Sequence, residues 1–143
     1  MPIVLDVAQY ILEQTGAVST WKLQKLVYYS QAWHAVWEDT PLFTSRIEAW
    51  ANGPVAPELY ERHRGMFVIR EVSGGSSGRL RRNERESIDL VIDHYGKMNG
   101  QQLSDLTHSE GPWQKARQGI EPGDPCNREI TLESMTDYYS SLE

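Results

Sequence analysis

The chain has 143 residues, of which 39% are hydrophobic and 24% are charged, values that fit one ordinary globular domain over residues 1–143. No apolar run reaches the about 18 residues that a membrane span requires, and a single cysteine, Cys126, excludes an internal disulfide. The formal net charge of −6 argues against a general nucleic-acid binder.

Residues 3–15 are expected to form an amphipathic helix rather than a signal peptide. The segment lacks a basic region and contains Asp6, and Gly16 suits a left-handed helix end. Its apolar residues recur at helical spacing on one face: Val4, Val7, Ala8, Ile11 and Leu12. A single cysteine and no signal peptide together favour a reducing cytoplasm as the location.

Residues 20–38 are expected to form the central helix. Ser19 or Thr20 caps its start, and Pro41 places its end near residues 37–39. One apolar row consists of Leu23, Leu26, Val27, Ser30, Trp33, His34 and Trp37, and a second of Tyr29, Ala32 and Val36. The few polar positions left are Lys22, Gln24, Lys25, Gln31 and Glu38. A helix that is apolar around much of its girth predicts other helices packed on it, with the aromatic side chains in the core.

Residues 46–50 are a candidate strand, and the ANGPVAP segment after them predicts a rigid corner. Gly53 permits a positive φ and Pro54 fixes its own φ, while Pro57 suits the first turn of a short helix. The corner has two interpretations: a structural turn, or a preformed partner-binding loop made of Asn52, Gly53, Pro54 and Val55.

Residues 67–72 read as a strand, the SGGSSG segment at 73–78 as a mobile hairpin tip, and residues 79–82 as a returning strand. The segment that follows the tip is locally basic, with Arg79, Arg81, Arg82 and Arg85. It is interpreted as a solvated hairpin or, alternatively, as a basic lip that meets an acidic partner or RNA.

The C-terminal half predicts four more helices. Asn83 and Glu86 have capping-box spacing at the start of the first, which Gly96 would end. Residues 101–108 and a helix opening at Pro112 follow, and after a loop at 119–129 Thr131 caps the last helix. The predicted fold class is therefore mainly α: five to six helices in a bundle around residues 20–38, with a small β-hairpin or two- to three-stranded sheet.

The best candidate for an active site is Thr107, His108, Ser109 and Glu110. Successive helical positions point about 100° apart, so these side chains do not converge on one reacting atom. The histidines have no metal-ligand spacing, and no phosphate-loop or dinucleotide motif is present. We therefore predict a protein that is not an enzyme and that needs no cofactor or metal.

Binding to a partner suits the composition better, because 5 Trp and 7 Tyr are more aromatic anchors than a core of this size needs. The predicted partner contacts are the loop residues Asn52, Gly53, Pro54 and Val55, together with Tyr28, Trp50, His108, Trp113 and Tyr138.

Three blocks carry a resemblance to a known family: KLQKLVYYSQAWHAV, IEAWANGPVAPELY and LTHSEGPWQKAR, in that order, between Lys22 and Arg117. Together they resemble the Panacea domain of SocA-like and GepA-like phage-associated antitoxins. The resemblance implies a small helical protein that neutralises a cognate toxin, encoded nearby, by binding it. SocA-like members also resemble proteolytic adaptors that deliver the toxin to ClpXP. The alternative is a phage-associated nucleic-acid-binding regulator or a small enzyme that uses the His108 region.

Overall fold

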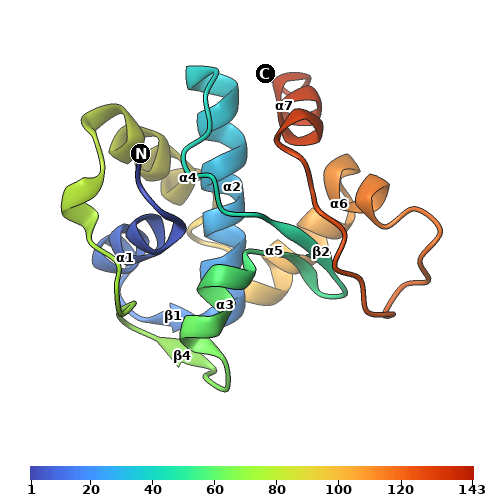
Figure 1. Ribbon diagram of the computed structural model, residues 1–143, viewed down its shortest axis with the longest axis horizontal. Coiled ribbons are helices and arrows are strands. Elements are labelled where there is room, and N and C mark those ends of the chain that lie inside the picture. The colour runs from blue at the N-terminus through green and yellow to red at the C-terminus, as the bar shows by residue number, and fades with distance from the viewer.

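The computed structural model describes residues 1–143 as seven α-helices, one 3₁₀ helix and two antiparallel two-stranded sheets (Figure 1). The helices are α1 (Val4–Thr15), α2 (Thr20–Glu38), α3 (Pro57–His63), η1 (Ser77–Arg79), α4 (Arg82–Tyr95), α5 (Gly100–His108), α6 (Gly111–Ala116) and α7 (Leu132–Ser140). The strands are β1 (Val18–Ser19), β2 (Glu48–Trp50), β3 (Gly53–Val55) and β4 (Val68–Ile69). The mainly α class with a small β element is confirmed. None of the helices combines the length and the apolar character that crossing a bilayer would need.

Helix α2 is the central element, and Figure 1 shows it running through the middle of the molecule. It packs against α1, α4, α5 and α7, and Leu23, Leu26 and Val27 are fully buried. Ser19 Oγ accepts the Lys22 N–H at 3.1 Å and caps its start. The predicted bounds and the central place of this helix are confirmed.

Three of the five positions of α2 that were expected to be polar and to face solvent are buried instead. The side chains of Gln24, Lys25 and Gln31 are only 3%, 2% and 4% exposed. The Gln31 amide donates to Phe43 O at 2.7 Å and accepts the Leu42 N–H at 2.8 Å. These bonds satisfy backbone groups of the segment that follows α2, which explains why an amide lies in the interior.

The two sheets differ from the sheet that the sequence predicts. Strand β2 pairs with β3, so the corner segment is itself half of a hairpin, with Trp50 opposite Gly53. Only Val68–Ile69 of the expected 67–72 strand is regular, and it pairs with Val18–Ser19 rather than with residues 46–50 or 79–82. The predicted return of residues 79–82 as a strand was wrong because the chain after β4 leaves the sheet and packs on α1.

The SGGSSG segment is not a hairpin tip, and residues 79–82 are not a strand. The Ser76 N–H donates to Asp6 Oδ1 at 2.8 Å, and the Val72 N–H donates to Gln9 Oε1 at 2.8 Å. Gly75 lies so close to the Leu5 backbone that a Cβ there would collide with the Leu5 carbonyl. The glycines therefore allow a close approach to α1, which composition alone cannot distinguish from flexibility.

The cap of α4 also differs from its prediction. The helix starts at Arg82 with Arg81 as its N-cap, and Glu84 Oε1 accepts the Arg81 N–H at 2.7 Å. Asn83 and Glu86 thus lie inside the helix rather than at its cap. Gly96 follows the last residue of α4 but with a right-handed backbone.

Asp6 ties α1 to the segment before α4, and we expect Asp6→Asn to lower the unfolding free energy by about 2 kcal/mol. Its buried carboxylate accepts the N–H of Ile3 at 2.9 Å, the N–H of Ser76 and one nitrogen of Arg79 at 3.0 Å. The amide turns one acceptor into a donor and removes the charge that faces Arg79. Urea denaturation measures the change. The exposed Asp93→Asn is the control, with an expected effect within about 0.5 kcal/mol, and equal effects of the two variants would contradict the account.

The C-terminal helices follow their predictions closely. Thr131 caps α7 as predicted, by accepting the N–H of Ser134, and Asn99 caps α5 in the same way by accepting the N–H of Gln102. Helix α6 starts at Gly111, one residue before the predicted Pro112. Trp113 anchors α6 to the β2–β3 hairpin, because its indole Nε1 donates to Trp50 O at 2.8 Å.

Candidate partner-binding site

A pocket of about 1070 Å³ opens between the first turns of α2, the β2–β3 hairpin and α3. The turn at residues 65–67 and the loop at 123–127 complete its walls. Aromatic and apolar side chains dominate the opening, and buried polar residues lie at its base, which we define as Gln24, Lys25 and His63. Apolar walls with a few polar groups are typical of a binding site.

The pocket has an apolar rim, formed by Trp21, Met66 and Phe67. The exposed fractions are 42% for Trp21, 51% for Met66 and 89% for Phe67. The turn that carries Met66 and Phe67 is attached to the start of α2, because the Thr20 N–H donates to Phe67 O at 2.9 Å and the Thr20 hydroxyl donates to Met66 O at 3.3 Å. Large apolar side chains that remain exposed on a well-anchored turn mark an interaction surface.

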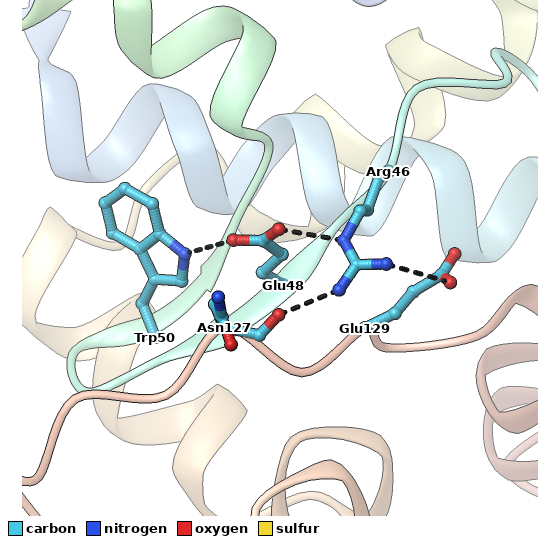
Figure 2. Close-up of polar contacts among 5 residues, drawn as sticks. All are labelled: Arg46, Glu48, Trp50, Asn127 and Glu129. Atoms are coloured by element: carbon cyan, nitrogen blue, oxygen red, sulfur yellow. Dashed lines mark hydrogen bonds and ion pairs between the residues drawn. The ribbon is translucent and has the colours of Figure 1, made fainter.

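A chain of polar contacts fixes the hairpin wall of the pocket. Figure 2 shows the Glu48 carboxylate between Trp50 and Arg46: it accepts the Trp50 indole N–H at 2.8 Å and the Arg46 Nε–H at 2.8 Å. Arg46 also donates to Asn127 O at 2.8 Å and lies 3.5 Å from a Glu129 carboxylate oxygen. These contacts hold the Trp50 ring and the 123–127 loop in place before any partner arrives, which lowers the entropic cost of binding.

The base of the pocket is a hydrogen-bonded polar layer. The Gln24 amide accepts the Ala56 N–H at 2.9 Å and donates to Ala56 O at 3.3 Å. The same amide nitrogen lies 2.9 Å from His63 Nε2, so this ring nitrogen is the acceptor and His63 is neutral. Burial lowers the pKa of His63, in agreement with the neutral form.

Lys25 differs from its neighbours at the base, because its amine has no counter-charge. The five ion pairs of the protein are all made by arginines. Burial alone lowers the pKa of Lys25 to about 7. A Cβ at Gly53, whose φ is +121°, would lie 2.5 Å from Lys25 Cε. Glycine is therefore required at position 53 for two reasons: the positive φ of the backbone, and the space that the Lys25 side chain occupies.

The predicted partner contacts separate into two groups. Trp50, Asn52 and Val55 line the pocket, while Gly53 and Pro54 are buried in β3 behind its surface. The hairpin therefore presents Asn52 and Val55 of the predicted loop to the pocket, while Gly53 and Pro54 face the interior.

The other predicted contacts lie elsewhere. Tyr28 is 1% exposed, and its hydroxyl lies 2.9 Å from that of Tyr139, so the expectation of a surface position for Tyr28 was wrong. His108 stacks on Trp113 with ring centroids 4.0 Å apart, and Tyr138 is half-buried on α7. Sequence reasoning did not select Trp21, Lys25 or Phe67, because a helical lysine and a strand-like Phe-Val-Ile run have ordinary explanations.

The hydroxyl and carboxylate groups next to His108 each make their own hydrogen bonds. The Thr107 hydroxyl donates to Ser104 O and the Ser109 hydroxyl to Leu106 O, both at 2.7 Å. Glu110 accepts hydrogen bonds from two tyrosines in the core, and His108 Nε2 is buried without a partner. The two hydroxyls and the carboxylate thus bond to separate partners, and none of these bonds joins them to His108.

The expected basic lip is partly neutralised. Arg79 pairs with Asp6 at 3.0 Å, and Arg82 pairs with Glu86 at 3.1 Å. Arg81 and Arg85 form no ion pair, so the positive charge of the segment is reduced but not removed.

Comparison with known proteins agrees with the family resemblance seen in the sequence. The family model described as "Antitoxin SocA-like, Panacea domain" matches residues 23–114, which is 92 of the 143 residues. The chain is 29% identical over 124 residues to the antitoxin SocA of Caulobacter vibrioides (strain NA1000 / CB15N). That match covers 75% of this chain and 66% of the relative, so the chain spans slightly less than two thirds of the relative's length. No solved structure matches.

Proposed function

The chain belongs to the antitoxin SocA-like Panacea domain family, and on that premise we propose that it is a cytoplasmic antitoxin that neutralises a cognate protein toxin by direct binding. The family match is the observation that carries this proposal. The matched region contains the β2–β3 hairpin, α3 and most of α2, which together supply most of the pocket.

The toxin would cover the apolar rim and the mouth of the pocket. Phe67 is the most exposed large apolar side chain of the protein, and Trp21 and Trp50 lie beside the same opening. Tryptophan and other aromatic anchors supply much of the binding energy in protein interfaces. The net charge of −6 would speed the approach of a basic toxin without fixing its position.

Co-expression with each neighbouring open reading frame tests the antitoxin function. We expect one neighbour to arrest growth alone, to be harmless together with this chain, and to co-purify with it. A locus in which no neighbour is toxic or binds would overturn the proposal.

Phe67→Ser tests the position of the interface. We expect at least about a tenfold loss of toxin affinity, which corresponds to about 1.4 kcal/mol, because an exposed anchor is lost and no core contact is removed. Leu90→Ser is the matched control, since Leu90 is 53% exposed on α4, which does not line the pocket. Isothermal titration measures both affinities. An unchanged affinity for Phe67→Ser, or an equal loss of affinity for Leu90→Ser, would show that the toxin does not bind at the apolar rim.

Occlusion of the toxin and delivery of the toxin to the ClpXP protease are two forms of the same function. Delivery predicts that the toxin half-life in cells is short with this chain present and lengthens when the protease is deleted. A half-life that does not depend on the protease would leave occlusion as the mechanism.

A further inference from the structure

Lys25 is almost entirely buried, and its amine forms no ion pair within the protein. Lys25 lines the base of the pocket, and its side chain is 2% exposed. The carboxylate that lines the same pocket, Glu48, is already occupied by Arg46 and the indole of Trp50. The pocket is therefore lined by one amine that has no counter-charge from the protein.

A buried amine without a hydrogen-bonded counter-charge is unfavourable, and removing it or pairing it relieves the penalty. An anion that enters the pocket would complete the missing pair, and the start of α2 at Thr20 adds a favourable helix dipole on the same side. The exposed Asn52 also lines the pocket and offers an amide donor. One amine and one amide suit a singly charged carboxylate better than a phosphate, which is usually held by arginines or by several backbone N–H groups.

We propose that this pocket binds a carboxylate, that Lys25 is the residue that pairs with it, and that the carboxylate is an acidic side chain inserted by the toxin. The inference rests on the proposed antitoxin function for the identity of the partner. A protein is the favoured source because a small anion inside the pocket would leave Phe67 and Met66 exposed on the rim, whereas a protein segment would bury them.

The proposal predicts a proton linkage. Two titratable groups interact with Lys25, His63 on α3 and His108 on α5, and burial lowers the pKa of both. Glu48 on β2 lines the same pocket but is held by Arg46. Free Lys25 loses its proton above a pKa of about 7, so binding of a carboxylate above that pH must restore one proton. Toxin affinity is therefore expected to weaken by up to about tenfold per pH unit between pH 7 and 9, and this slope should be absent in Lys25→Met.

The experiment compares the wild-type chain with Lys25→Met, with the exposed Lys97→Met as the charge-matched control. One measurement is NMR titration with phenylacetate and with its neutral isostere phenylacetamide, and it needs no toxin. The other is titration with the purified toxin at pH 7 and pH 9. We expect wild type and Lys97→Met to bind phenylacetate at the pocket in preference to the amide, and Lys25→Met to lose this preference. We also expect Lys25→Met to weaken toxin binding at pH 7 by tenfold or more.

Each outcome has a defined meaning. Equal phenylacetate binding by wild type and Lys25→Met would overturn the carboxylate site. Lys25-dependent phenylacetate binding together with unchanged toxin affinity in Lys25→Met would overturn the toxin as the source and assign the site to a small carboxylate. If no toxin binds the wild-type chain, the proposed function fails, while the phenylacetate comparison still decides the carboxylate site.

Discussion

Lys25→Met is expected to raise the unfolding free energy by about 3–5 kcal/mol at pH 7, the reverse of an ordinary core substitution. Burial lowers the pKa of Lys25 from 10.5 to about 7, so the folded state binds its proton far less tightly than the unfolded chain does. Each unit of that difference corresponds to about 1.4 kcal/mol. Methionine has nearly the same length and places no polar atom at the base of the pocket.

The sign of the effect can be checked with pH. Because the folded pKa is depressed, burying Lys25 costs no free energy above the unfolded pKa, where the amine is neutral in both states. The unfolding free energy of wild type falls as pH falls toward 7, because the unfolded chain then binds a proton that the folded chain does not. Wild type should therefore gain stability from pH 7 to pH 9 relative to Lys25→Met. The difference in unfolding free energy between the two proteins should shrink by about 2 kcal/mol over this range. Urea denaturation at both pH values, with Lys97→Met as the control, gives the result. A Lys25→Met protein less stable than wild type would show that the amine has a partner in the folded chain.

Glu110→Ala is expected to lower the unfolding free energy by about 3 kcal/mol. The carboxylate oxygen Oε1 accepts the hydroxyls of Tyr29 and Tyr139, each at 2.7 Å, and joins α2 and α7 to the start of α6. Both tyrosines are fully buried, so alanine leaves two hydroxyls without an acceptor and opens a cavity beside them. Thermal unfolding followed by circular dichroism measures the loss.

Glu110→Gln separates the charge of this group from its hydrogen bonds. The amide keeps an oxygen acceptor, so we expect a loss of about 1 kcal/mol or less near neutral pH. Burial raises the pKa of Glu110, and the two tyrosine hydrogen bonds oppose this shift only in part. A raised pKa means that wild type loses stability as pH rises through the folded pKa, whereas the glutamine variant does not. A glutamine variant as unstable as alanine, or a difference from wild type that does not depend on pH, would contradict this account.

The helical frame could be predicted because its signals are local. The apolar rows of residues 20–38, the capping side chains of Ser19 and Thr131, and the break before Pro112 each act within a few residues. The strand pairings could not be predicted in the same way. Pairing of Val18–Ser19 with Val68–Ile69 joins segments about fifty residues apart, and two-residue strands carry almost no periodicity.

The polar interior was the other part that the sequence did not predict. A lysine or glutamine on a helix has the same local pattern whether it faces water or a backbone segment from elsewhere. Gln31 is buried because it bonds to residues 42 and 43, and Gln24 because it bonds to Ala56. Lys25 is buried because the β2–β3 hairpin closes over it at Gly53. These partners become neighbours only in the folded chain.

The site prediction from the sequence was correct for some residues and wrong for others. Asn52 and Val55 were selected from the turn signal of their loop and Trp50 as a surface aromatic, and all three line the pocket. Tyr28 was selected as a surface aromatic, but its ring packs in a cluster with Tyr29 and Tyr139. Aromatic residues serve cores and interfaces equally well, so composition alone could not assign Tyr28 to either.

Titration of the purified toxin with this chain is the most direct test of neutralisation by binding. The account predicts a stable equimolar complex by calorimetry and light scattering, with Phe67→Ser weakening the complex and the protection of growing cells in parallel. Cells protected by co-expression although the two purified proteins form no complex would contradict direct binding, and would mean that the chain acts on the toxin's target or modifies the toxin.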